Sequence, residues 1–218
     1  RVERMDALEL IGSLDDGSVS ALITDPPYNV TDYEWDSFRD IEDFVEWTRS
    51  WLVAARSKLA ERYHAAVFCD ARFSPVMYGL LLEAGYQVQR QCIWHRPNLA
   101  KKRSGSRTFL SSYEPFWHCG NTDLYLPEQW GAERFDVQSF AAPQSNHKKD
   151  PSYHPCQKPI GLIEQLVKVM SPPGSLVLDP YLGSGTTALA CQMHGRRFVG
   201  CDLDEEHIKI TQGRLADG

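Results

Sequence analysis

The segment LVLDPYLGSGTTA, residues 176–188, decides the fold of this chain. Its first residues are apolar and typical of a short buried strand, and its last residues begin a helix that extends to about His194. Between them lies a loop with two glycines, Gly183 and Gly185, which together with Ala188 match the pattern G-x-G-x-x-A. A strand, a glycine loop and a helix in this order form the nucleotide-binding turn of parallel α/β sheets. The segment therefore predicts an α/β fold with a cofactor site at the end of a strand.

Asp179 distinguishes between the cofactors that such a loop can hold. It stands at the end of the strand, where a dinucleotide would place its pyrophosphate, and a carboxylate there repels that anion. The same carboxylate suits an ammonium group, such as that of a methionine moiety. Asp202 ends the next apolar run and can accept hydrogen bonds from ribose hydroxyls, whereas we expect Asp204 to cap the last helix. The loop lacks the lysine of a phosphate-binding G-x-x-x-x-G-K-[ST] motif, which disfavours a nucleoside triphosphatase. The main alternative is a dinucleotide-dependent oxidoreductase, because the loop matches G-x-G-x-x-A.

Apolar runs alternate with helical patterns along the rest of the chain. Strands are expected near residues 21–24, 65–69, 87–95, 114–119, 176–178 and 198–201, and helices near 6–11, 41–59, 74–84, 160–170, 186–194 and 204–215. Such alternation predicts a mostly parallel sheet with helices on both faces. We expect a single Rossmann-like domain, residues 1–218, with a seven-stranded sheet and the cofactor at its topological switch point.

A second motif, Asp25-Pro26-Pro27-Tyr28, follows an apolar strand directly. Two consecutive prolines fix their own φ angles and restrict the residue before each, so the turn is stiff and extended. The Asp25 carboxylate and the Pro26 carbonyl can each accept one N–H of an aromatic amino group and stabilise the positive charge that forms on its nitrogen. Tyr28 can stack on a base that has left the duplex. The alternative is a rigid strand exit with a packed tyrosine.

The two motifs, in this order, resemble the β class of the DNA amino-methyltransferases. In most methyltransferases the cofactor motif comes first, whereas here the tetrapeptide precedes Asp179, as in the β class. The resemblance extends over nearly the whole chain. It implies S-adenosylmethionine as the cofactor, a Rossmann-like methyltransferase fold, no metal, and Asp25, Pro26, Pro27 and Tyr28 as catalytic residues.

The resemblance also implies which residues hold the cofactor. Asp6 corresponds to the acidic residue near the cofactor adenine, and HPCQKP (154–159) resembles the HPTQKP that helps to cradle the methionine end. The implied set is Asp6, His154, Gln157, Lys158, Asp179, Pro180, Tyr181, Gly183, Ser184, Gly185, Thr186, Thr187 and Asp202. Cys156 replaces a threonine of the family pattern, Tyr181 a phenylalanine, and Asp202 a frequent glutamate. The first of these departures weakens a hydroxyl contact to the cofactor.

The first residue of the tetrapeptide bears on the base that is methylated. In the family an aspartate there favours N6 of adenine and a serine favours N4 of cytosine, so Asp25 predicts adenine and leaves cytosine as the alternative. RNA base methyltransferases share the tetrapeptide but usually carry it after the cofactor motif. A catalytically silent DNA-binding module is disfavoured because Asp25 and Asp179 are both present.

Two basic clusters are expected to contact double-stranded DNA. The net charge of −6 disfavours a nucleic-acid partner, but the loop at 96–107 holds several basic residues and no acidic one. The expected DNA-binding residues are Arg96, Lys101, Lys102, Arg103, Arg107, Lys148 and Lys149. The family places target recognition in the segment corresponding to 120–153, which is short here. Either the target sequence is short, or a partner subunit, as in a homodimer, helps to read it.

The composition is that of an ordinary globular domain, with 42% hydrophobic and 24% charged residues. No apolar run is long enough to cross a membrane, and the first residues contain no leader-like apolar stretch. The six cysteines form no C-x-x-C pair, so we expect neither disulfides nor zinc, and a reducing, cytoplasmic compartment.

Overall fold

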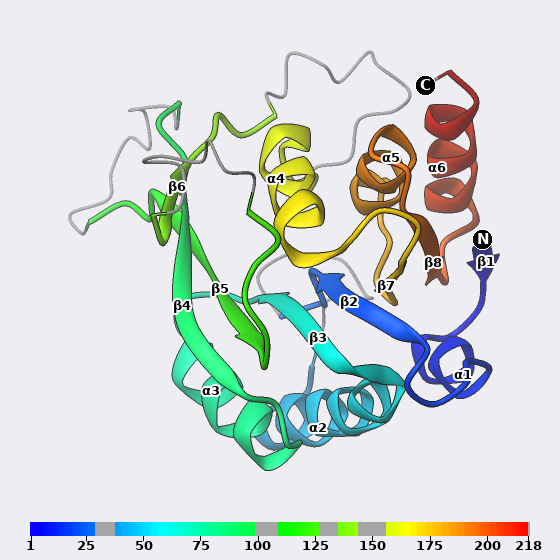
Figure 1. Ribbon diagram of the computed structural model, residues 1–218. Helices are drawn as coiled ribbons and strands as arrows, with labels where there is room; N and C mark the ends of the chain where they lie inside the picture. The colour runs from blue at the N-terminus through cyan, green and yellow to red at the C-terminus, as the bar shows by residue number, and fades with distance from the viewer. Residues whose placement is uncertain (29–37, 99–108, 127–134, 144–155, 218) are drawn as a thin grey trace.

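The computed structural model describes residues 1–28, 38–98, 109–126, 135–143 and 156–217. Within them the chain forms one sheet with helices on both faces (Figure 1). The strands are β1 (Val2–Arg4), β2 (Val19–Thr24), β3 (Leu59–Phe68), β4 (Val88–His95), β5 (Tyr113–Gly120), β6 (Val137–Ser139), β7 (Leu176–Asp179) and β8 (Arg197–Asp202). The helices are α1 (Ala7–Gly12), α2 (Ile41–Lys58), α3 (Ser74–Glu83), α4 (Ile160–Met170), α5 (Thr186–Met193) and α6 (Glu205–Asp217).

The strands lie in the order β1-β8-β7-β2-β3-β5-β4-β6. The expected mostly parallel sheet is confirmed, since only the pairs β3–β5 and β5–β4 are antiparallel. The expected number of strands was too low, because the described residues form eight and not seven. The two strands that none of the six predicted ranges covers, β1 and β6, are three-residue edge strands, and runs this short carry no apolar pattern that a sequence can reveal.

The two faces of the sheet are covered by helices from different parts of the chain. α1, α2 and α3 lie on one side and α4, α5 and α6 on the other (Figure 1). Alternate residues of β2 serve both sides: Leu22 belongs to the core with Trp51 of α2, and Ala21 and Ile23 belong to the core with Leu162 of α4. A strand buried on both faces is continuously apolar, as the sequence of β2 indicates.

The boundary between α2 and β3 differs from the expectation. Leu59 was assigned to the helical face, but α2 ends at Lys58 and Leu59 has extended backbone angles, with φ −70° and ψ 136°. It begins a ten-residue strand and pairs with Val19 of β2. Parallel pairing with a distant strand determines this boundary, and the helical spacing of the residues does not reveal it.

The positions of β2 and β7 create the switch point that the sequence predicted. From β2 the chain passes through α2 to β3 on one side, and from β7 it passes through α5 to β8 on the other. β2 and β7 pair in parallel, with Ala21 opposite Val177 and Leu22 opposite Leu178. Their carboxyl ends therefore lie side by side where the connections diverge, which is where open α/β sheets bind ligands.

Candidate active site

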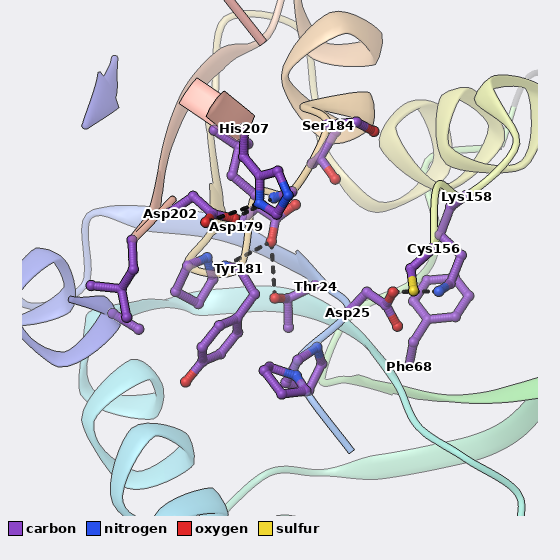
Figure 2. A pocket seen from close by; sticks show the side chains of 18 of the residues that line it. Thr24, Asp25, Phe68, Cys156, Lys158, Asp179, Tyr181, Ser184, Asp202 and His207 are labelled. Carbon is purple, nitrogen blue, oxygen red and sulfur yellow. Dashed lines mark hydrogen bonds and ion pairs between the residues drawn. The ribbon is translucent and has the colours of Figure 1, made fainter. Parts of the chain in front are cut away.

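A cavity of about 380 Å³ lies at the carboxyl ends of β2 and β7 (Figure 2). Residues of both predicted motifs line it, together with others of the expected cofactor set. The predicted residues in its wall are Asp6, Asp25, Pro26, Pro27, Tyr28, Gln157, Lys158, Asp179, Pro180, Tyr181, Gly183, Ser184, Thr186, Thr187 and Asp202. Segments far apart in the sequence thus share one site.

Asp179 is the most deeply desolvated carboxyl group of this wall. Its exposed fraction is 4%, its Oδ1 accepts hydrogen bonds from Thr24 Oγ1 (2.9 Å) and the Tyr181 backbone N–H (3.2 Å), and no described cation forms an ion pair with it. Burial raises its pKa to about 7, although hydrogen bonds from Thr187 and Thr24 act in the opposite direction. A buried carboxylate without a positive partner is a receptor for a ligand's cationic group, and this observation fits the ammonium of a methionine moiety.

The glycine loop brings the backbone close to this carboxylate. Gly183 and Gly185 have φ angles of +51° and +74°, in the left-handed region that favours glycine. At Gly185 a Cβ atom would lie 2.5 Å from the Thr211 side chain, so α6 leaves no room for a larger residue. Gly185 itself does not line the cavity but gives the loop its shape, and the loop leads directly into α5.

Asp202, at the end of β8, holds the rim of the glycine loop. Its Oδ2 accepts from the Gly183 backbone N–H (2.9 Å), and its Oδ1 accepts from the Asp204 N–H (2.9 Å) and contacts His207 Nδ1 (3.1 Å). Burial works against its ionisation, but His207 and these backbone donors outweigh it and lower the pKa of Asp202. Asp204 accepts from the Glu206 N–H (2.8 Å), which confirms it as the cap of α6.

The opposite wall is aromatic. The Tyr181 ring contacts two tryptophans of α2, with centroid distances of 5.4 Å to Trp47 and 5.5 Å to Trp51. Asp6 caps α1 through the Leu8 N–H (2.8 Å) and lines the cavity on the same side. An apolar wall with an acidic residue at its edge suits an adenine ring with an exocyclic amino group.

The Asp25 carboxylate lies beside Lys158. Asp25 Oδ2 accepts a hydrogen bond from Lys158 Nζ, whereas Asp25 Oδ1 is buried and accepts no hydrogen bond from a described residue (Figure 2). Burial raises the pKa of Asp25, the charge of Lys158 opposes that effect, and the nearby Tyr28 hydroxyl opposes it more weakly. One carboxylate oxygen of this cavity-lining residue therefore lacks a hydrogen-bond donor among the described residues.

Lys158 and Arg96 make contacts other than those expected. Lys158 lines the cavity, but its Nζ lies between Asp25 and Glu114, 3.2 Å from Glu114 Oε2. Arg96 Nη1 is 2.8 Å from Glu114 Oε1, and the Arg96 side chain is only 19% exposed. These contacts point inward, so the expected roles of Lys158 toward the cofactor and of Arg96 toward DNA stay predictions.

The remaining expected residues lie outside the described part of the chain. His154 of the cofactor set belongs there, as do the basic residues Lys101, Lys102, Arg103, Arg107, Lys148 and Lys149. The expected target-recognition segment, 120–153, is described only at residues 120–126 and 135–143.

The sequence placed Thr24 in a strand without a role at the site, although its hydroxyl donates to Asp179. Three further residues that shape the site were also missed. Glu114 begins an ordinary strand pattern, His207 lies in the first turn of a surface helix, and Trp47 follows the apolar face of α2 by one position. Of these three, only Trp47 could have been identified from the sequence, because it lies three residues after Phe44 and therefore near the same face of the helix. The other two are brought to the site by tertiary structure.

Other features of the chain bear on the site indirectly. None of the six cysteines, all of which lie in the described ranges, forms a disulfide. The described ranges contain no group of three or more His, Cys, Asp or Glu side chains that could hold a metal ion. No helix in the same ranges has both the length and the apolar character needed to span a membrane.

Comparison with known proteins places the chain among DNA methylases. The family model described as DNA methylase (N6_N4_Mtase) matches residues 19–213. Type II methyltransferase M.ScaI of Streptomyces caespitosus is 27% identical over 243 aligned positions, which cover 96% of this chain and 79% of that protein.

Solved structures share the fold. The crystal structure of the M1.HpyAVI–SAM complex has a TM-score of 0.78 and 24% identity, and covers 99% of this chain and 98% of its own. The PvuII DNA methyltransferase, described as cytosine-N4-specific, has a TM-score of 0.80 and 18% identity, with 98% and 85% coverage. At these identities the likeness concerns the fold.

Proposed function

This chain belongs to the DNA methylase family, and on that premise we propose that it transfers a methyl group from S-adenosylmethionine to the N6 amino group of adenine in double-stranded DNA. The observation that carries the proposal is that two carboxylates in one cavity each lack a different kind of interaction partner. Within the described part of the chain, Asp179 is buried without a cationic partner and Asp25 has a buried oxygen without a hydrogen-bond donor, and both line one cavity.

The cofactor is assigned to the β7–β8 side of the cavity. Asp179 would pair with its ammonium, Asp202 would bind its ribose hydroxyls, and Asp6 with the aromatic wall at Tyr181 would hold its adenine. S-adenosylmethionine supplies an electrophilic methyl group on a sulfonium. Cofactor-bearing relatives such as the M1.HpyAVI–SAM complex share this fold, which supports the assignment.

The base is assigned to the β2 side. The target adenine would leave the duplex and stack against Tyr28. Asp25 Oδ1 and the Pro26 carbonyl would each accept one N–H of the amino group, hold its nitrogen toward the methyl group and stabilise the charge that forms on it. After transfer the nitrogen gives up one proton, and the Asp25 carboxylate is placed to take it and pass it to solvent.

The preference for adenine rests on Asp25 as the first residue of the tetrapeptide. The cytosine-N4-specific neighbour has the same fold, so the fold supports either base equally, and N4 of cytosine is the second candidate. Residues 1–218 would form one catalytic domain, with the loop at 96–107 contacting DNA and 120–153 reading the target.

The product of the reaction tests the proposal. The protein is incubated with mixed-sequence duplex DNA and methyl-labelled S-adenosylmethionine, the DNA is digested to nucleosides, and the label is identified by chromatography. Label in N6-methyl-2′-deoxyadenosine is expected. Label in N4-methyl-2′-deoxycytidine would replace the adenine assignment, and labelling of RNA with none of duplex DNA would overturn the DNA assignment.

A further inference from the structure

The ammonium group of Lys158 is enclosed in the described structure. It contacts Asp25 Oδ2 and lies 3.2 Å from Glu114 Oε2. The rings of Phe68 and Trp94 close it off at 5.3 Å and 5.8 Å from Nζ to their centroids, distances typical of cation–π contacts. The whole residue is only 7% exposed. A side chain held by two carboxylates and two aromatic rings has little freedom to reach a ligand.

We propose that Lys158 and Glu114 are positioning residues that hold Asp25 Oδ2 so that Oδ1 faces the target amino group, and that Lys158 is not a ligand of the cofactor. The inference deepens the proposed function and rests on the role assigned there to Asp25. It also gives a function to Glu114, which neither the sequence motifs nor the cofactor assignment uses.

Glu114 supports the arrangement from the antiparallel part of the sheet. It lies in β5 opposite Trp94 of β4, and its Oε1 is paired with Arg96 Nη1 at 2.8 Å. Arg96 is in turn anchored by Nη2 to the backbone carbonyls of Ser111 (3.3 Å) and Tyr113 (3.5 Å). Two carboxylates and two cations therefore alternate from Asp25 to Arg96, and the charges balance.

A balanced, enclosed network is sensitive to the removal of one member. Taking away one partner of a buried ion pair leaves an uncompensated charge, whereas the intact network fixes one geometry. For Asp25 that geometry leaves Oδ1 without a donor among the described residues, as is also the case for Glu114 Oε2 in the same network. A displaced acceptor would misplace the attacking nitrogen, and misplacement of about 1 Å can cost roughly 10²-fold in rate.

The charged groups around Asp25 act on it in opposite directions. Lys158 favours its ionised form and the negative Glu114 disfavours it, with Tyr28 as a weak third influence. Asp179 and the Cys156 thiol also lie in the same cavity wall, and the charge of Asp25 raises the pKa of Asp179. Neutralising Lys158 should therefore raise the pKa of Asp25, and neutralising Glu114 should lower it.

Single-turnover methyl transfer to duplex DNA, measured against pH at saturating cofactor, tests the inference. The variants are Lys158→Met, Lys158→Arg and Glu114→Gln, with Lys168→Met as a control, because Lys168 is an exposed residue of α4 whose ammonium is paired with Glu164. Cofactor Kd is measured in parallel by calorimetry, and folding by thermal unfolding.

The expected result is a rate loss of roughly 10²-fold in Lys158→Met with cofactor Kd nearly unchanged. The acid limb of the pH–rate profile should move to higher pH in Lys158→Met and to lower pH in Glu114→Gln. Lys158→Arg should recover part of the rate. If Lys158→Met does not fold, the opposite shift in the isosteric Glu114→Gln carries the test alone.

Two results would overturn the inference. One is a large rise in cofactor Kd at an unchanged rate in Lys158→Met, which is the behaviour of a cofactor ligand. The other is an acid limb that stays in place in Glu114→Gln. Both differ from failure of the proposed function, in which Asp25→Asn itself would retain methyl transfer.

Discussion

Thr24 Oγ1, at the end of β2, donates a 2.9 Å hydrogen bond to Oδ1 of Asp179, at the end of β7. Thr24 is the residue before Asp25, so one hydrogen bond joins the strand that carries the proposed catalytic carboxylate to the strand that carries the proposed cofactor carboxylate. Both groups are buried, and the bond is therefore shielded from solvent. This hydrogen bond therefore helps to fix the position of the proposed base site relative to the proposed cofactor site.

The pH dependence of cofactor binding follows from Asp179. Its pKa is about 7 in the ligand-free protein because of burial, so below that pH a proton must leave before an ammonium can pair with it. Cofactor affinity should fall about tenfold per pH unit below pH 7 and level off above it. Calorimetry across pH 5.5–8.5, in buffers of different ionisation enthalpy, measures both the affinity and the released proton.

Asp179→Asn is the matched control for that dependence. Because the folded state holds a proton that the unfolded chain loses near 3.8, the free energy of unfolding of the ligand-free protein should fall as pH rises from about 4 to about 7. The variant should lose this decline and the pH dependence of binding, and should bind cofactor at least 10²-fold more weakly. Unchanged affinity in Asp179→Asn would contradict the assigned role.

Thr24→Val tests the bond between the two strands. Loss of a hydrogen bond to a charged group costs about 1.5–3 kcal/mol, so cofactor affinity should fall by roughly one order of magnitude, and the pH below which it declines should rise. Thr48→Val is the control, since Thr48 of α2 is equally buried but its Oγ1 has no hydrogen-bond partner among the described residues. The control should bind normally; equal losses in both variants would assign the effect to packing.

Gly185→Ala and Gly174→Ala separate backbone strain from steric clash. Both glycines have positive φ angles, +74° and +76°, but a Cβ meets Thr211 at 2.5 Å in the first and open space in the second. Gly174→Ala should cost about 1–2 kcal/mol of unfolding free energy from strain alone. Gly185→Ala should cost clearly more, measured by urea denaturation at a common m value. Equal costs would mean that α6 moves away without resistance.

Charge reversal of Lys101, Lys102 and Arg103 tests the predicted DNA loop. These residues lie outside the described ranges, so the prediction rests on the sequence. Binding to duplex DNA should weaken, and the slope of log K against log salt should shrink by about 0.9 per lost phosphate contact. Reversal of Lys209, an exposed residue of α6 paired with Glu205, is the control. An unchanged slope in the loop variant would show that the loop faces away from DNA.

The sequence predicted the parts of this site that depend on local patterns. Asp25 and Asp179 each follow a short apolar strand, and the carboxyl ends of parallel strands meet at one edge of a sheet, so their proximity follows from the fold class. The positive φ angles of Gly183 and Gly185 likewise follow from the glycine loop. Asp204 as a helix cap was equally local.

The parts that sequence reasoning missed depend on pairing between distant segments. Glu114 reaches Lys158 because β5 runs antiparallel beside β3 and β4, and nothing in the pattern of residues 113–120 indicates that neighbour. The edge strand β1 exists only through its pairing with β8. The family resemblance assigned Lys158 to the cofactor, whereas the fold brings it into contact with Asp25 and Glu114.

The most direct test of the account compares the native protein with Asp25→Asn in single-turnover transfer of labelled methyl groups to duplex DNA, with cofactor Kd measured on the same samples. The account predicts that Asp25→Asn loses at least 10²-fold in transfer rate, because its amide cannot match a carboxylate in stabilising the charge on the amino nitrogen. Cofactor Kd should stay within about threefold of the native value. Transfer at a near-native rate, or loss of cofactor binding together with activity, would contradict the role assigned to Asp25.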